Sequence, residues 1–136
     1  MSSKLNLKII TPERILVDEE VDAVYSLAVD GEFGILPEHI PFMTALNIGV
    51  SKYVQGDKTE YISTIGGILQ VENNNVSILS DAAELGEEID IARARAAKER
   101  AEARLGTAEK ETDVDRAQAA LARAIVRIKA ASKGHL

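Results

Sequence analysis

Apolar and polar residues alternate in short runs through the first 86 residues. Leu5, Leu7 and Ile9 alternate with polar neighbours, which is the period of two that a strand shows when one face is buried. Turn-forming residues at 55–57 and 73–75 separate later runs that are rich in β-branched and aromatic side chains. Many short strands joined by tight turns predict an antiparallel β-sandwich. The later strands are expected at 21–29, 50–54, 61–65, 68–71 and 76–79.

The last 50 residues follow a helical period instead. Acidic residues precede a first apolar stripe, which predicts a helix over about 88–105. Thr112 and Asp115 have the spacing of a capping box, so a second helix is expected over about 113–132. A connection of about seven residues allows the two helices to fold back as an antiparallel hairpin. The acidic residues are Glu87, Glu88 and Asp90, and the helix-ending glycines are Gly106 and Gly134.

Composition changes at the same place in the chain. Residues 1–86 hold 5 basic and 13 acidic side chains and all three prolines, whereas residues 87–136 hold 11 basic and 9 acidic side chains and 14 alanines. We therefore expect two domains, a β-sandwich over 1–86 and a helical hairpin over 87–136.

Several functional classes do not fit the composition. A net charge of −6 argues against general nucleic-acid binding. The start of the chain lacks the apolar centre of a secretory signal, and no apolar run approaches the roughly 20 residues that cross a bilayer, so no membrane insertion is expected. Cysteine is absent, and two isolated histidines, His39 and His135, do not make a metal site.

The seam between the two expected helices is thin, because the first helix offers mostly methyl groups. At about 25 cal/mol per Å² of apolar surface, alanine contributes far less than leucine. The hairpin is then either a switch with a small energy gap between two states or a closely packed, stable element; periodicity alone supports both interpretations. The stripes are Ile91, Ala94, Ala97, Ala101 and Leu105 on the first helix, and Val114, Ala117, Leu121, Ala124, Ile125 and Ile128 on the second.

Charged side chains gather on two helical faces. Asp90, Arg93 and Arg100 share one face of the first helix, where two guanidiniums could hold a polyphosphate and a carboxylate could orient them. On the residues alone, ordinary surface ion pairs, such as Asp90 with Arg93, are the favoured explanation of this face. On the second helix, a basic stripe suits an acidic protein surface or is a solvated face. This basic stripe comprises Arg116, Arg123 and Arg127.

The segment from Asp30 to Leu46 is expected to form a shaped loop, because two glycines and two prolines direct its path. No Gly-Lys-Ser/Thr follows the glycines, so it is not a P-loop. His39 could act as an acid or base, but no nucleophile or second carboxylate stands at a telling spacing. A structural or interface role is favoured over catalysis.

Three stretches resemble the epsilon subunit of the F-type ATP synthase of bacteria and plastids. They are ITPER at 10–14, DGEFGILPEHIPFMTAL at 30–46 and GGILQVENNNVSILSDAAE at 66–84. The similarity runs through essentially the whole chain. Ile40 departs from the alanine that is common in the family, but the change is conservative in polarity.

The resemblance implies a non-catalytic subunit of the central stalk. Such a subunit binds gamma, lies near the ring of c subunits, and couples proton flow to ATP synthesis in the alpha and beta subunits. It is peripheral, at the cytoplasmic face of the bacterial inner membrane or the equivalent thylakoid face. No metal or required cofactor is implied. The interface residues expected from the characteristic loop are Glu32, Gly34, Leu36, Pro37, His39 and Pro41.

The resemblance also implies that the hairpin opens along gamma and inhibits ATP hydrolysis. We expect the basic stripe of the second helix to make the inhibitory contact with acidic segments of beta. Residues 89–94 resemble the family's I/L-D-x-x-R-A motif, which binds ATP on the folded hairpin, so ATP is expected as a regulatory ligand. A free-standing nucleotide-sensing regulator remains the alternative, and co-purification with gamma separates the two. The ATP-binding residues expected are Glu84, Ile89, Asp90, Arg93, Ala94 and Arg100.

Overall fold

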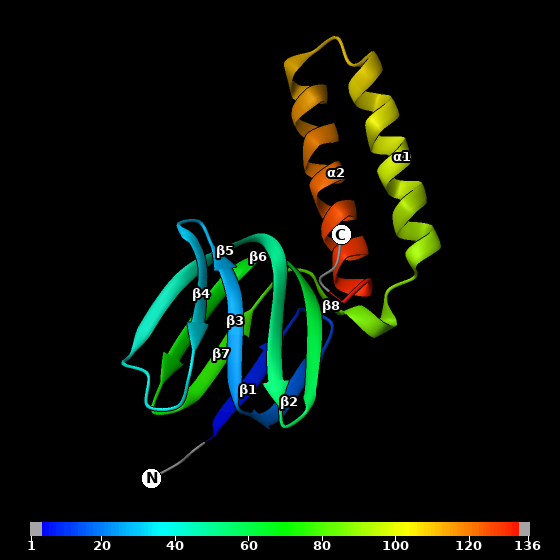
Figure 1. The fold of residues 1–136 in the computed structure, drawn as a ribbon. Coiled ribbons are helices and arrows are strands. Elements are labelled where there is room, and N and C mark those ends of the chain that lie inside the picture. Colours follow the sequence, from blue (N-terminus) through cyan, green and yellow to red (C-terminus); the bar gives the residue numbers. More distant parts are fainter. Residues whose placement is uncertain (1–3, 134–136) are drawn as a thin grey trace.

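The computed structural model describes residues 4–133 and shows a β-sandwich with a helical hairpin standing beside it (Figure 1). The sheet order is β2-β1-β7-β6-β5-β3-β4, and β8 pairs with β6. All strand pairs are antiparallel except β1 with β7. The predicted fold class is therefore confirmed, apart from this parallel pair. The strands are β1 (Leu5–Ile10), β2 (Ile15–Val21), β3 (Ala23–Ala28), β4 (Gly31–Ile35), β5 (Phe42–Gln55), β6 (Lys58–Glu72), β7 (Asn75–Leu79) and β8 (Ala83–Leu85).

Two of these strands are much longer than their sequence pattern indicated. The runs expected at 61–65 and 68–71 are parts of one strand, β6, which has 15 residues and pairs with the 14-residue β5. Gly66 and Gly67, with φ of 71° and 128°, interrupt the pattern of side chains without ending the strand. The predicted turns are confirmed, with left-handed backbone at Gly56 and at Asn73 and Asn74.

Three strands were not predicted, namely β2, β4 and the three-residue β8. β2 is rich in acidic residues and lies at an edge of the sheet, so few of its side chains are buried. β4 lies inside the segment that was expected to be a loop. Its Gly34 is suited to the strand, because a Cβ at this position would lie 2.8 Å from the ring of Tyr25 on β3. The loop prediction for 30–46 was therefore too long, and only residues 36–41 connect β4 to β5.

The buried core belongs to the sandwich. Leu5, Leu7 and Ile9 of β1 are almost completely buried, as their alternation predicted. They pack in one cluster with apolar side chains of the other strands and receive no buried member from the helices. The hairpin is therefore attached to a sandwich that has its own core.

The helices begin and end at different residues from those expected. After the short helix η1 (Gly86–Glu88), the helix α1 runs over Ile91–Thr107 and α2 over Glu111–Ala131. Asp90 caps α1 by accepting a hydrogen bond from the Arg93 backbone N–H at 3.1 Å, which fixes the start of the helix.

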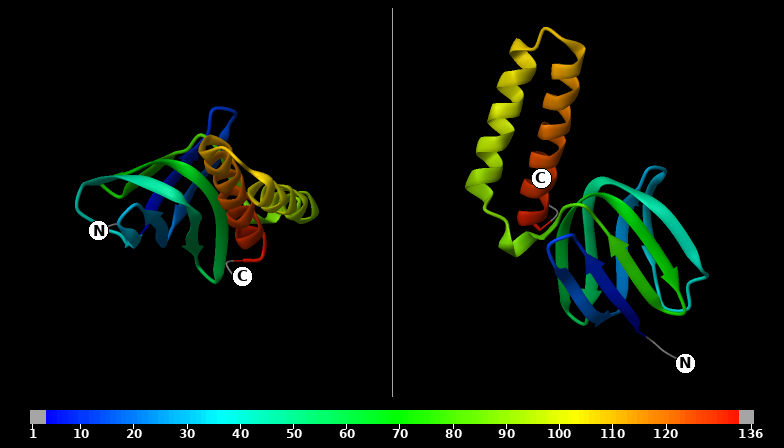
Figure 2. Two further views of the ribbon diagram at one scale, coloured as in Figure 1. Left: turned by 90° about the horizontal axis from the view of Figure 1, so that it is seen from above. Right: turned by 180° about the vertical axis from the view of Figure 1, so that it is seen from behind.

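The connection between the helices has three residues, 108–110, in place of the seven expected. Gly106 does not end α1, which continues by one residue, and Thr112 is not a cap, because α2 already starts at Glu111. The stop expected at Gly134 lies outside the described residues. A short connection keeps the two helices antiparallel and adjacent (Figure 2).

The alanine seam is confirmed. Ala94 and Ala101 of α1 and Ala117 and Ala124 of α2 are each 1–4% exposed. In both views of Figure 2, α2 lies between α1 and the sandwich, and it contacts β5, β6, β8 and η1. α2 consequently buries a second face against the sandwich, which the single apolar stripe of the sequence did not predict. The additional buried residues of α2 are Val126 and Ala130.

Candidate functional site

A pocket of about 450 Å³ lies where β8, η1 and the two helices meet. All six residues that the sequence predicted for ATP binding line this pocket. They come from β8, from the two residues before α1, and from α1 itself. This arrangement is possible because α2 packs on β8, η1 and the long strands of the sandwich, while α1 packs on α2. The residues that line it are Glu84, Glu88, Ile89, Asp90, Arg93, Ala94, Ala97, Arg100 and Arg127.

The start of α1 fixes the acidic and basic groups on one side of the pocket. Arg93 and Arg100 are seven residues apart, so they lie on the same helical face two turns from each other. Ala94 and Ala97 line the same pocket, and their short side chains leave room in front of the guanidiniums. Asp90 Oδ1 already accepts the helix-capping hydrogen bond and is held in place by it.

Arg127 of α2 reaches the pocket from the opposite side. Its Nε donates to Oε1 of Glu84 on β8 at 2.7 Å, in an ion pair that joins the hairpin to the sandwich. An arginine has five N–H donors in a planar fork, so the Nη groups remain available to a further anion. Arg127 was expected only in the inhibitory contact, and no pattern in the sequence indicated its place here, because the pairing joins residues 43 positions apart.

The pocket holds three carboxylates and three guanidiniums, and their pairing is uneven. Glu84 pairs with Arg127, and Glu88 pairs with Arg14, which lies outside the lining. Among the residues described, Arg93 and Arg100 have no ion-pair partner, and the expected Asp90–Arg93 pair does not form. Two unneutralised guanidiniums on one face suit a ligand with several negative charges, such as a polyphosphate.

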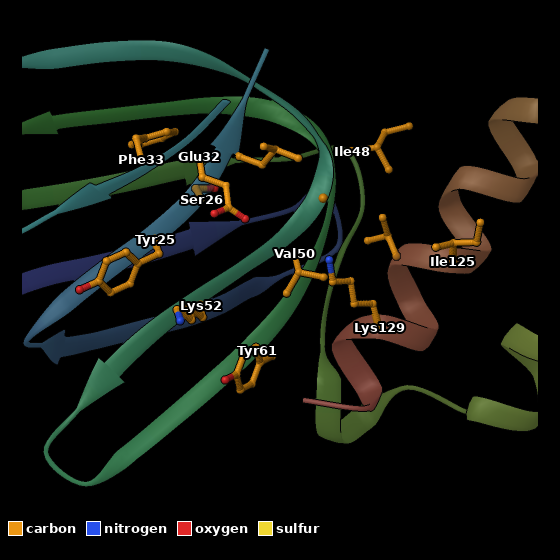
Figure 3. Close-up of a pocket in the computed structure, with 13 residues that line it drawn as sticks. Tyr25, Ser26, Glu32, Phe33, Ile48, Val50, Lys52, Tyr61, Ile125 and Lys129 are labelled. Atoms are coloured by element: carbon orange, nitrogen blue, oxygen red, sulfur yellow. The ribbon is translucent and has the colours of Figure 1, made fainter. Parts of the chain in front are cut away.

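A larger pocket of about 570 Å³ lies between α2 and the outer face of the sandwich. Figure 3 shows Ile125 and Lys129 of α2 facing Ile48 and Val50 of β5 across it. No pattern in the sequence predicts this pocket, because α2 forms one of its walls by packing on the sheet. Its lining also includes Tyr25, Phe33 and Tyr61, which are three of the chain's five aromatic residues.

The expected interface residues separate into two places. Glu32 and Gly34 belong to β4, and Glu32 lines the larger pocket. The other four lie in the connection between β4 and β5, where Ile40 is 73% exposed. This connection is anchored to the β6–β7 turn, since the Glu38 N–H donates to Oδ1 of Asn74 at 2.7 Å. The four residues are Leu36, Pro37, His39 and Pro41.

His39 has no arrangement for catalysis. Its Nδ1 lies 2.7 Å from the Ile40 carbonyl oxygen, and its ring lies 5.8 Å from the ring of Phe42. No nucleophile or carboxylate hydrogen-bonds to it in the described part of the chain. Exposed apolar side chains lie near this histidine in the sequence instead, at Leu36 and Ile40 of the connection and at Met43 at the start of β5.

The three arginines of the predicted inhibitory contact do not form one surface in this arrangement. Arg116 lies near the tip of the hairpin, in a shallow pocket with Arg104 and Lys110. Arg123 is half-buried, and Arg127 is held by Glu84 in the pocket described above. A contact through all three would require α2 to leave the sandwich.

Metal and membrane features are also defined for residues 4–133. No group of three or more His, Cys, Asp or Glu side chains is arranged to hold a metal ion within this range. None of the helices in this range is long and apolar enough to span a membrane.

Comparison with known proteins defines the class of the chain. Residues 4–86 match the family model "ATP synthase, Delta/Epsilon chain, beta-sandwich domain", and residues 87–132 match "ATP synthase, Delta/Epsilon chain, long alpha-helix domain". The chain therefore belongs to the delta/epsilon chain family of ATP synthases.

Its relatives identify the branch of the family. An ATP synthase epsilon chain of Desulforamulus reducens is 47% identical over 131 residues, which cover 96% of this chain and 99% of that protein. One of Carboxydothermus hydrogenoformans is 50% identical over 105 residues, covering 77% of this chain and 78% of that one. The resemblance to bacterial epsilon subunits is thus confirmed.

A solved structure supports the fold alone. A chain in the mitochondrial ATP synthase of Euglena gracilis superposes with a TM-score of 0.83 at 23% identity, covering 99% of this chain and 84% of that chain.

Proposed function

We propose that this chain is a non-catalytic subunit of the central stalk of a bacterial F-type ATP synthase. It binds gamma and the c-ring and couples their rotation to ATP synthesis at catalytic sites on the alpha and beta subunits. Family membership supports this role. The exposed apolar side chains of Leu36, Ile40 and Met43, where β4 connects to β5, also suit contact with another subunit. The subunit is peripheral, at the cytoplasmic face of the inner membrane.

We also propose that ATP binds in the pocket of about 450 Å³ and regulates the hairpin. The observation that carries this proposal is the convergence of Arg93, Arg100 and Arg127 from two helices on one cavity beside the sandwich. A ligand that contacts both helices and the sandwich binds the closed arrangement more tightly than an open one. It therefore shifts the population toward the closed state when ATP is plentiful.

Release of the hairpin provides the inhibitory state. When ATP is scarce, α2 leaves the sandwich, extends along gamma and presents Arg116, Arg123 and Arg127 to acidic segments of beta. Arg127 participates in both states, since it pairs with Glu84 in the closed arrangement and belongs to the basic stripe that meets beta in the open one. ATP binding and inhibition then exclude each other through a shared residue.

Calorimetric titration of the isolated protein tests ATP binding. We expect saturable binding that is strongly weakened in Arg93→Ala and Arg100→Ala. Arg95→Ala is the matched control, because Arg95 is exposed on the same helix and does not line the pocket. An absence of binding at millimolar ATP would refute the regulatory part of the proposal and leave the stalk role intact.

Hydrolysis by the reconstituted complex tests inhibition. Replacing Arg116 and Arg123 by glutamate reverses the charge of the basic stripe without touching the ATP pocket, so hydrolysis at low ATP should rise. Arg95→Glu again serves as the control, and equal hydrolysis in all variants would exclude the assigned contact. Retention of gamma during purification of the complex separates a stalk subunit from a free-standing regulator.

A further inference from the structure

A residue far from both helices reaches the edge of the ATP pocket. Arg14 lies in the turn between β1 and β2, within the ITPER stretch, and its Nη2 donates to Oε2 of Glu88 at 2.6 Å. Glu88 is the last residue of η1 and lines the pocket. This ion pair joins residues 74 positions apart in the chain.

The backbone of Arg14 is fixed on the sandwich. The Thr11 N–H donates to the Arg14 carbonyl oxygen at 2.9 Å, and the Arg14 N–H donates to Thr11 Oγ1 at 3.3 Å. Thr11 is itself buried. The guanidinium of Arg14 is thus presented to η1 from a rigid turn, which defines where the Glu88 carboxylate is held.

Electrostatics give this pairing a consequence for the ligand. Glu84 forms an ion pair with Arg127 inside the pocket, and Asp90 accepts the backbone N–H that caps α1. Glu88 is the third carboxylate, and its partner comes from outside. Without that partner, a full negative charge would face the same space as the phosphates that Arg93 and Arg100 attract.

We infer that Arg14 is a positioning residue of the nucleotide pocket, which neutralises Glu88 and holds its carboxylate away from the bound polyanion. This inference rests on the proposed binding of ATP. A purely structural role predicts something different. Arg14 and Glu88 are 53% and 44% exposed, and exposed ion pairs contribute little to stability. Loss of Arg14 should therefore change ATP affinity while leaving thermal unfolding almost unchanged.

Titration of the full-length protein with ATP tests the inference through a double-mutant cycle. Arg14→Gln should weaken binding roughly fivefold to tenfold, as expected for one uncompensated charge near a polyanion at the surface. Glu88→Gln should tighten binding, since it removes the carboxylate. The double variant should return to within about twofold of the unmodified protein, because the pair is then neutral again. Arg14→Lys should retain most of the affinity.

Salt and a matched control complete the test. The loss in Arg14→Gln should shrink as salt rises, because screening weakens interactions of exposed charges. Lys58→Gln removes an exposed lysine from its ion pair with Glu60 at 3.0 Å, away from the pocket, and should bind ATP like the unmodified protein.

Each contrary outcome has a distinct meaning. If the unmodified protein binds ATP and Arg14→Gln binds equally well, the inference is wrong while the proposed function stands. If the double variant is as weak as Arg14→Gln, Arg14 does not act through Glu88, and the inference is again wrong. If the unmodified protein does not bind ATP, the proposed binding fails, and this inference fails with it.

Discussion

Replacing Ala101 by leucine tests whether the seam of the hairpin is as weak as its composition indicates. Ala101 is 1% exposed, and α1 packs chiefly on α2. The four buried alanines of the seam contribute about 3 kcal/mol, at about 0.8 kcal/mol for each buried methyl group. Overpacking a closely packed site costs about 1–3 kcal/mol. The leucine side chain therefore removes between a third and all of this contribution.

Hydrogen exchange measures the effect directly. Amides of α1 should exchange roughly 5 to 150 times faster in Ala101→Leu, which is the rate change that corresponds to about 1–3 kcal/mol of local opening. Amides of β1 and β7 should not change, because the sandwich has its own core. Ala103→Leu places the same side chain on the exposed face of α1 and should leave exchange unaltered. Unchanged exchange in Ala101→Leu, or α1 protection as deep as that of the β core in the unmodified protein, would refute the reasoning and make the hairpin a stable element.

Three further predictions concern stability. Gly67→Ala should lower the free energy of unfolding by roughly 2–4 kcal/mol in denaturant titration, because φ there is 128° and a Cβ would lie 2.3 Å from the Leu79 carbonyl oxygen. Gly106→Ala, by contrast, meets no atom within 4 Å inside a helix and should stabilise α1 by up to about 1 kcal/mol. Burial and the hydrogen bond to Glu19 raise the pKa of Tyr53. The neutral phenol therefore contributes stability that is fully present below about pH 10 and is lost as pH rises beyond that value, and Tyr53→Phe should remove this alkaline dependence from thermal melts.

The sequence predicts the fold where local pattern and burial coincide. β1 buries alternate residues and was identified from its alternation. β2 was missed because an edge strand buries few side chains, and β4 was missed because its glycines resemble those of a loop. The length of β6 was underestimated for a similar reason, since two glycines lie inside it. In each case, pairing with the neighbouring strand outweighs the local preference.

The candidate site shows the same division. One helical wheel places Asp90, Arg93 and Arg100 together, because all three lie within the first three turns of the hairpin. Arg14 and Arg127 approach the pocket only through tertiary structure, from 74 and 43 residues away from their partners. No spacing in the sequence reports such distances. The ITPER stretch and the basic stripe of α2 contained these residues, but their pattern gave no indication of the carboxylates that they would meet.

The central claim is that ATP holds the hairpin closed, and the distance between the hairpin tip and the sandwich tests it most directly. The chain has no cysteine, so Glu72→Cys and Glu109→Cys place one spin label on β6 and one at the tip, both at exposed positions. Pulsed electron paramagnetic resonance should show a single distance at saturating ATP and a second, different distance in addition without nucleotide. Identical distance distributions in the two conditions would contradict the account.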